Sequence, residues 1–212
     1  MDRQYVILVV NPGATSTKVS VYDDLRERVS RTIRHSADEL KPYASVADQF
    51  GFRRDLVLEA LREEGVEFAS LSAVIGRGGL VKPIESGVYE VNDALRRDLG
   101  HAPQGEHASN LGGLIAADIA SRIPGARAFI ADPVVVDELD DVARVAGHPL
   151  FRRVSIFHAL NQKATGRRYA RENGRAYEEY PFPVRDSQSG YMVLLEQSIP
   201  ASNTSSSSPP GP

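Results

Sequence analysis

The sequence contains no cysteine, no apolar run of membrane-spanning length and no strong excess of either charge. Without cysteine, disulfide bonds and thiolate metal sites are excluded. A membrane span needs about 20 consecutive apolar residues, and no stretch approaches that length. The formal net charge of -3 gives no bulk reason to expect nucleic acid or an anionic membrane as a partner. The first residues also lack a cleavage site of the secretory type, so we expect a cytoplasmic protein.

The 212 residues have the composition of an ordinary globular protein, with 42% hydrophobic and 25% charged residues. Short apolar or alternating runs predict three consecutive strands near the N-terminus, at residues 5–10, 18–22 and 28–33. Helical patterns follow, with short apolar strands between them, giving helices at residues 53–64, 110–123 and 158–173 and strands at 73–75 and 128–131. Strands that alternate with helices after an opening set of strands indicate an α/β fold with a mixed sheet.

The turn between the first two predicted strands has the sequence NPGATSTK, residues 11–18. Glycine lets the backbone approach a ligand closely, and three hydroxyls with one ammonium offer donors to phosphate oxygens. The turn is not a Walker phosphate loop, because the second glycine is missing and a strand follows Lys18. Taken alone, the segment is at least as well explained as a hydroxyl-rich hairpin turn, so both interpretations stay open.

Arg77 lies between glycines, in the sequence Gly76-Arg77-Gly78-Gly79, after a predicted buried strand. Small neighbours leave its guanidinium accessible, and the planar fork can grip a carboxylate or a phosphate with two hydrogen bonds. A solvated arginine in a loose loop explains the same residues equally well.

Asp132 follows the predicted strand at residues 128–131. Open α/β sheets place their ligand groups at the carboxyl ends of strands. A carboxylate in that position can hold Mg²⁺ through water. The alternative is a helix or turn cap, because Asp-Pro commonly begins a turn.

His158 stands at the predicted start of a helix, where its ring can donate a hydrogen bond to an oxyanion. A partly buried structural histidine is the alternative, and it is the commoner role for a single histidine. The other four histidines are at positions 35, 101, 107 and 148, and none of them stands at the spacing of a second metal ligand from His158. We therefore reject a metal site built from histidines.

Five segments in order carry a resemblance to a known family: VNPGATSTK (10–18), GRGGLVKPI (76–84), GEHASNLGG (105–113), DPVVVDEL (132–139) and IFHALNQKATGRRYA (156–170). They resemble the butyrate kinases, with the acetate kinases as more distant relatives. The last two segments are particularly close to butyrate kinases and branched-chain acyl kinases, whereas acetate kinases differ at both. The resemblance runs from about Tyr5 to Glu179.

The resemblance implies a family architecture of two domains with ribonuclease-H-like cores, as in sugar kinases, actin and the heat-shock chaperone ATPase. We expect residues 1–179 to contain the first domain, with a mixed sheet, and the start of a truncated second domain. The implied reaction is reversible phosphoryl transfer from ATP, with Mg²⁺, to a short-chain carboxylate such as butyrate or a branched analogue. The product is an acyl phosphate, and the family implies a homo-oligomer.

The resemblance also implies roles for single residues. It places four residues of the turn against the phosphates and Mg²⁺, namely Asn11, Thr15, Thr17 and Lys18. Arg77 would bind the acyl carboxylate and neutralise charge on the moving phosphoryl group. Asp132, with Asn11, would hold Mg²⁺ partly through water, and His158 would donate to transition-state oxygens. Such a site suits a reaction between two anions, in which catalysis depends on positioning and charge stabilisation.

The family pattern breaks after Glu179. The family continues with a strand and a His-x-Gly-Gly-Gly phosphate loop, but Gly190 is the only glycine between Pro181 and Pro210, so no such loop is possible there. Residues 180–212 are rich in Ser and Pro and predict a disordered tail outside the family. We hypothesise that a frameshift or a misplaced gene end replaced the second domain, and we expect no measurable kinase activity from the 212 residues. The downstream nucleotides, read in the other two frames, test this: without a His-x-Gly-Gly-Gly segment in either, the hypothesis fails.

Two alternatives compete with an acyl kinase. The first is a non-catalytic remnant that binds a small anion or a partner protein, and it should bind nucleotide weakly or not at all. The second is a nucleotide-dependent interaction module of the chaperone or actin kind, against which the GRGG and FHALNQKA segments speak. A titration with butyrate, ATP and Mg²⁺ separates the kinase from the remnant.

Overall fold

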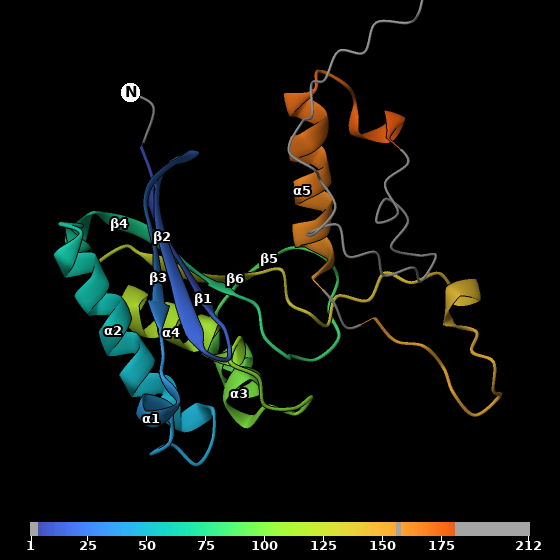
Figure 1. Ribbon diagram of the computed structural model, residues 1–212, viewed down its shortest axis with the longest axis horizontal. Helices are drawn as coiled ribbons and strands as arrows, with labels where there is room; N and C mark the ends of the chain where they lie inside the picture. Colours follow the sequence, from blue (N-terminus) through green and yellow to red (C-terminus); the bar gives the residue numbers. More distant parts are fainter. Residues whose placement is uncertain (1–3, 156–157, 181–212) are drawn as a thin grey trace, which may run out of the picture.

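A computed structural model describes residues 4–155 and 158–180, without the side chain of residue 159 (Figure 1). The five predicted strands are confirmed, and with β5, which was not predicted, they form one six-stranded sheet in the order β3-β2-β1-β4-β6-β5. Strands β1, β4 and β6 are parallel, whereas β2, β3 and β5 pair antiparallel with their neighbours, so the sheet is mixed as expected. The bounds are β1 (Val6–Pro12), β2 (Ser16–Asp23), β3 (Arg26–Arg34), β4 (Leu71–Arg77), β5 (Val88–Glu90) and β6 (Arg127–Ala131).

The three predicted helices are also present, and two more were missed. The α-helices are α1 (Ala37–Leu40), α2 (Phe50–Glu63), α3 (Asp93–His101), α4 (Asn110–Ser121) and α5 (Ala159–Glu172). Short 3₁₀ turns accompany them at η1 (Ala47–Gln49), η2 (Phe68–Ser70), η3 (Asp141–Arg144) and η4 (Tyr177–Glu179). Helix α3 was not predicted, because its sequence is mostly polar. Asn92 caps this helix by accepting a hydrogen bond from the Leu95 N–H. None of the helices in the described part of the chain is long and apolar enough to cross a membrane.

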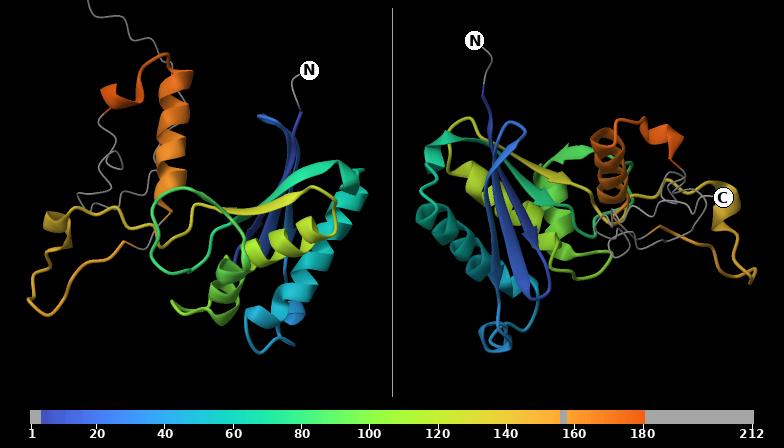
Figure 2. Two further views of the ribbon diagram at one scale, coloured as in Figure 1. Left: turned by 180° about the vertical axis from the view of Figure 1, so that it is seen from behind. Right: turned by 45° about the horizontal axis from the view of Figure 1, so that its top comes forward.

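Helices cover one face of the sheet (Figures 1 and 2). Helix α4 packs on β1, β4 and β6, helix α2 packs on β2, and α3 packs on α4. Burial along the strands alternates accordingly, because successive side chains of a strand point to opposite faces. The fully buried apolar side chains of the sheet include Leu8, Val10, Val19, Val21, Val74 and Ile130. The apolar side chains of α4 are buried except that of Leu114, which is only partly buried.

The contact between β4 and α4 is unusually close, because glycine faces glycine. A Cβ atom added at Gly76 would lie 2.2 Å from the carbonyl carbon and oxygen of Gly112 and 2.5 Å from the amide nitrogen of Gly113. Real Cβ atoms never approach backbone atoms so closely, so side chains larger than hydrogen are excluded here. The end of β4, and Arg77 with it, is thereby held against the N-terminal turn of α4.

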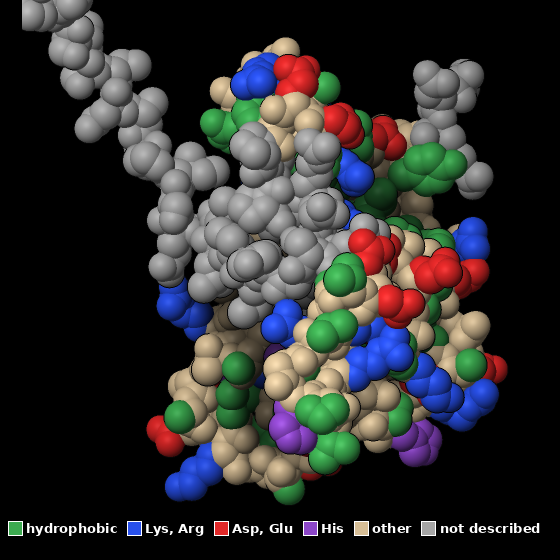
Figure 3. Space-filling view, turned by 90° about the vertical axis from the view of Figure 1, so that its right-hand side faces the viewer, with side chains coloured by type: hydrophobic (Ala, Val, Ile, Leu, Met, Phe, Trp, Pro, Cys, Tyr) green, Lys and Arg blue, Asp and Glu red, His purple; other side chains and the backbone are tan. Residues whose placement is uncertain are grey.

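Helix α5 stands apart from the layer of α2, α3 and α4 (Figures 1 and 2). An irregular segment, residues 137–155, separates it from β6 in sequence and lies on the right-hand side of Figure 1, which is the side that faces the viewer in Figure 3. The segment carries several exposed apolar side chains: Val142, Val145, Leu150, Phe151 and Val154. An ion pair of 2.8 Å between Lys163 Nζ and Glu138 Oε2 ties α5 to it. The tail predicted at residues 180–212 lies outside the described residues beyond Tyr180.

Candidate functional site

The candidate residues of three neighbouring strands end at one edge of the sheet. Asn11 is near the end of β1, Arg77 ends β4, and Asp132 follows β6 directly. Because these strands are parallel, their carboxyl ends meet at the same edge, and Asp132 lies at the carboxyl end of its strand as expected. The pairing of Val9 with Ile75 and of Asn11 with Lys18 places Asn11, Lys18 and Arg77 on one face. It is the face opposite α2 and α4.

Arg77, Asp132 and His158 lie close together, although His158 follows Arg77 by 81 positions in the sequence (158 − 77). The Asp132 carboxylate Oδ2 lies 3.8 Å from Arg77 Nη2 and 3.0 Å from His158 Nδ1. The His158 Nδ1–H also donates to the Asp132 carbonyl oxygen at 2.8 Å. Since both acceptors are oxygens, Nδ1 carries a proton, and Nε2 is the ring nitrogen left for a ligand. Nε2 donates to a ligand oxygen only when it carries the second proton of the ring.

Asp132 also holds the start of helix α5. Its Oδ1 accepts hydrogen bonds from the backbone N–H groups of Leu160, at 3.1 Å, and Asn161, at 3.3 Å. The residue has a φ of +54°, a left-handed conformation that aspartate tolerates better than most residues. The capping interpretation of Asp132 is therefore correct, but the cap acts on a helix 28 residues further along the chain.

Arg77 does not lie in a loose loop. The turn that follows it is fixed by a hydrogen bond of 2.6 Å from the Gly78 N–H to the Ala131 carbonyl. Asn110, which the sequence analysis missed, accepts from the Leu80 N–H at 2.7 Å and donates to the Gly105 carbonyl at 3.1 Å. The feature of the sequence that could have marked Asn110 is its position directly before the apolar helix pattern. These bonds hold the Arg77 backbone in place and leave its side chain partly exposed.

The hairpin between β1 and β2 separates its predicted ligand residues into two groups. Thr15 and Lys18 are exposed and Asn11 is partly buried, so these three reach the surface. Thr17 is fully buried, and its hydroxyl lies 2.9 Å from His35 Nε2 and 3.2 Å from Arg53 Nη1. The structure therefore places Thr17 beneath the hairpin.

His35 is buried beside Arg53, and it gives the hairpin a pH-dependent support. Burial, and then the nearby charge of Arg53, hold the pKa of His35 below its ordinary value. Its neutral form is therefore preferred in the folded chain, and the ring packs edge-on against Phe52. Glu39 acts weakly in the opposite direction.

We expect a fall in stability as the pH drops below about 6.5, because the unfolded chain then takes up a proton at His35 that the folded chain resists. In His35→Gln this contribution is absent. Urea unfolding between pH 7.5 and 5 should show the parent losing up to about 1.4 kcal/mol per pH unit more than the variant. Parallel stability curves for the two proteins would contradict this assignment.

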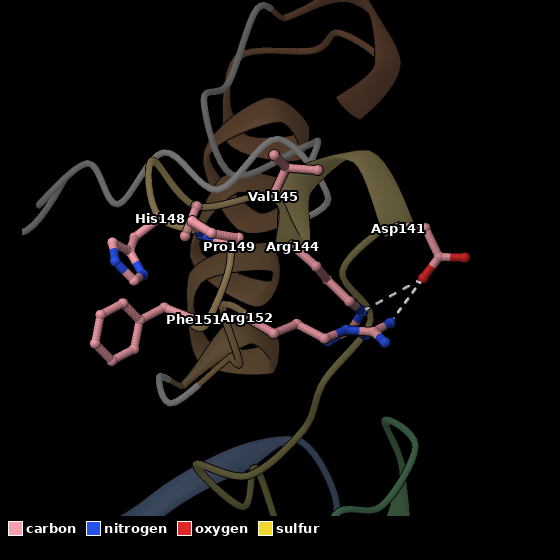
Figure 4. A pocket seen from close by; sticks show the side chains of 8 residues that line it. Asp141, Arg144, Val145, His148, Pro149, Phe151 and Arg152 are labelled. Atoms are coloured by element: carbon pink, nitrogen blue, oxygen red, sulfur yellow. Dashed lines mark hydrogen bonds and ion pairs between the residues drawn. The ribbon is translucent and has the colours of Figure 1, made fainter.

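A hollow in the 137–155 segment offers a second group of cations, but they are already paired (Figure 4). Arg152 Nη2 lies 2.9 Å from Asp141 Oδ1, and Arg144 Nη1 lies 2.7 Å from Asp137 Oδ2. His148 and Phe151 point away from these guanidinium groups and stack on each other. An anion would have to displace the aspartates, so the sheet edge is the better candidate.

The sheet edge does not form a metal cage made only of protein groups. In residues 4–155 and 158–180, no cluster of three acidic, histidine or cysteine side chains could hold a metal ion. Mg²⁺ does not need such a cluster, because it is usually bound through one or two carboxylates, water and the phosphates of a nucleotide. Asp132, as the one carboxylate beside Arg77 and His158, fits a metal that arrives with a nucleotide.

Comparisons with known proteins give relatives of one kind. No protein-family model matches the chain. It is 55% identical over 175 residues to butyrate kinase 1 of Clostridium acetobutylicum, which covers 82% of this chain and 49% of that protein. It is 52% identical over 191 residues to a probable butyrate kinase of Bacteroides thetaiotaomicron, which covers 90% and 54%. Among solved structures, a Porphyromonas gingivalis acetate kinase matches with a TM-score of 0.55 at 13% identity, over 82% of this chain and 50% of that one.

The structural match supports the predicted α/β fold with a mixed sheet. The chain spans about half the length of the curated relatives it matches. The Bacteroides match is longer than 179 residues, and the boundary expected at Glu179 stays a prediction. At about 50% identity over four-fifths or more of its residues, this chain is a homologue of the butyrate kinases.

Proposed function

We propose that this chain carries the phosphate- and carboxylate-binding part of a carboxylate kinase that uses ATP and butyrate or a similar short acid. The observation that supports it best is the meeting of Arg77, Asp132 and His158 at the sheet edge that also carries Asn11 and Lys18. Arg77 and His158 beside the Asp132 carboxylate, with Lys18 on the same face of the sheet as Arg77, suit a reaction between two anions, in which charge must be neutralised. The butyrate kinase relatives support the same reaction class.

In the proposed reaction, a carboxylate oxygen of the acid attacks the terminal phosphorus of ATP. A new oxygen–phosphorus bond forms, the bond to the ADP oxygen breaks, and the products are acyl phosphate and ADP. Arg77 binds the carboxylate and faces the moving phosphoryl group, and Lys18 with the Thr15 hydroxyl binds phosphate oxygens. His158, oriented by Asp132, donates from Nε2 to an equatorial oxygen when the ring is doubly protonated.

Bound Mg²⁺ would supply charge neutralisation on the phosphates, and Asn11 and Asp132 are the residues that would hold it, partly through water. Thr17 takes a different part in this proposal. Because its hydroxyl is buried against His35 and Arg53, we assign it to the support of the hairpin.

Removal of the Lys18 ammonium tests the hairpin as a phosphate site. We expect Lys18→Ala to weaken binding of tripolyphosphate about tenfold or more in isothermal titration calorimetry, because a charge-assisted contact is worth about 1.5–3 kcal/mol. Lys41→Ala removes the same group from another exposed position and should bind like the parent. Equal affinity of Lys18→Ala and the parent would exclude the hairpin from phosphate binding.

Turnover is tested separately, by trapping acyl phosphate with hydroxylamine from butyrate, ATP and Mg²⁺. We expect no hydroxamate from the 212 residues alone, since their relatives are about twice as long. Anion binding without hydroxamate agrees with a binding part that needs further residues for turnover, or with the non-catalytic remnant. Hydroxamate formation at the rate of a complete butyrate kinase would refute the expectation of inactivity.

A further inference from the structure

We propose that Arg53 is a positioning residue for phosphate binding, which holds the β1–β2 hairpin from beneath and places a buried, unneutralised positive charge under it. This inference rests on the proposed phosphate-binding role of the hairpin. Arg53 lies in the first turns of helix α2, and only 1% of it is exposed. No predicted site residue lies in this helix.

The guanidinium of Arg53 bonds to most of the hairpin. Its Nη1 donates to the carbonyl oxygens of Gly13, at 2.8 Å, and Ser16, at 3.3 Å, and its Nη2 donates to that of Ala14 at 3.1 Å. The remaining bonds run to the Thr17 hydroxyl and, from Nε and Nη2, to Gln49 Oε1 at 3.0 and 2.8 Å. One planar side chain therefore holds three peptide groups of the turn, through the carbonyls of Gly13, Ala14 and Ser16, together with the Thr17 side chain.

These bonds also determine where the N–H groups of the hairpin point. In a trans peptide unit the carbonyl and the following N–H point in opposite directions. Because the carbonyls of Gly13 and Ala14 point toward Arg53, the N–H groups of Ala14 and Thr15 point away from it. Both residues are exposed, so these N–H groups face the solvent. Successive N–H groups directed outward form a concave site that favours an anion.

The charge of Arg53 has no carboxylate partner within this set of contacts. Every acceptor it reaches is uncharged: three carbonyls, one hydroxyl and one amide oxygen. Buried arginines are normally paired with an acid, because an isolated charge is costly to remove from water. Burial accordingly lowers the pKa of Arg53. A phosphate on the outer side of the hairpin would supply the missing negative charge.

Arg53 has two separate proposed roles, the support of the hairpin through its hydrogen bonds and the attraction of phosphate through its charge. Gln49 contacts the guanidinium directly, so a change at Gln49 tests the charge alone. Gln49→Glu places a carboxylate on Nε and Nη2 in the same shape and neutralises the charge without breaking the support of the hairpin. If the unneutralised charge attracts phosphate, tripolyphosphate should bind about tenfold more weakly to this variant. The new ion pair should leave the melting temperature unchanged or raise it. A purely structural Arg53 would not respond in this way.

The experiment measures tripolyphosphate affinity by calorimetry and the melting temperature of each 212-residue variant. Gln4→Glu, at the opposite end of β1 from the hairpin, adds the same charge and should bind like the parent. Arg53→Met should lower both stability and affinity, and Arg53→Lys should recover part of the affinity, since it restores the charge. Parent-like binding by Gln49→Glu, or by folded Arg53→Met, overturns the proposal.

Failure of the proposed function has a different signature. If the parent binds no tripolyphosphate, or if Lys18→Ala binds as the parent does, the hairpin is not a phosphate site, and both proposals fall. If Lys18→Ala weakens binding and Gln49→Glu does not, the hairpin binds phosphate and only the role of Arg53 is refuted.

Discussion

Replacement of Asp132 by alanine is expected to release the N-terminus of helix α5 and to separate His158 from Arg77. The variant loses Oδ1, the single atom that accepts from both the Leu160 and the Asn161 N–H groups, and leaves alanine in a left-handed conformation. A lost cap costs about 1–2 kcal/mol, and the less tolerant backbone adds about 1 kcal/mol. We expect amide hydrogen exchange measured by mass spectrometry to accelerate across α5, while α4 keeps the protection of the parent.

Asp132→Asn is the matched control for this prediction. Asparagine tolerates the left-handed conformation and keeps an acceptor oxygen for the helix, but it lacks the charge. The protection of α5 should therefore be retained in Asp132→Asn and lost in Asp132→Ala. The same asparagine variant should weaken binding of Mg²⁺ with tripolyphosphate, because the carboxylate is gone. Unchanged exchange in Asp132→Ala would show that α5 is held by other contacts.

Replacement of Gly76 by alanine is expected to have the largest effect on stability. The added methyl group would meet backbone atoms of α4 at 2.2 Å, and backbone cannot swing aside as a flexible side chain does. The helix must move away from β4, which should cost more than about 3 kcal/mol. Urea unfolding measures the loss, which is a large share of the about 5–15 kcal/mol that stabilises a typical domain.

Gly51→Ala is the control for Gly76, because nothing lies within 4 Å of a Cβ atom at that position of helix α2. Alanine favours a helix over glycine by about 1 kcal/mol, so this variant should be slightly more stable than the parent. Opposite signs for the two glycine-to-alanine changes are the expected result. A Gly76→Ala protein as stable as the parent would mean that β4 and α4 are further apart than the structure places them.

Much of the fold was open to prediction, because the signals that form its elements are local. Alternating apolar residues predicted β1 to β3, and the apolar stripe with Pro124 and Gly125 after it predicted α4 and its end. Strand β5 was missed because three residues with an exposed Val88 give no pattern. Gly65, the residue after Glu64, has a φ of +63°, the left-handed conformation in which a glycine commonly ends a helix.

The sequence could not show which side chains of the hairpin face outward or what lies beneath it. Thr17 and Lys18 are neighbours with similar chemistry, and the alternation of β2 buries one and exposes the other. Arg53 was placed in the predicted helix without a role. A charged residue four positions before the buried Val57 lies on the core face, and this was the signal that could have marked it.

The sequence by itself indicated the resemblance to butyrate kinases, the α/β class and the candidate residues at the sheet edge, because ordered motifs and local periodicity can be recognised without coordinates. Only the tertiary structure decided how those residues act on one another. The parallel pairing of β1, β4 and β6 brings Asn11, Arg77 and Asp132 to one edge. Asp132 then caps a helix far along the chain, and Arg53 supports a hairpin 40 residues before it. Such contacts depend on strand register and helix packing, which are long-range properties that no local pattern encodes.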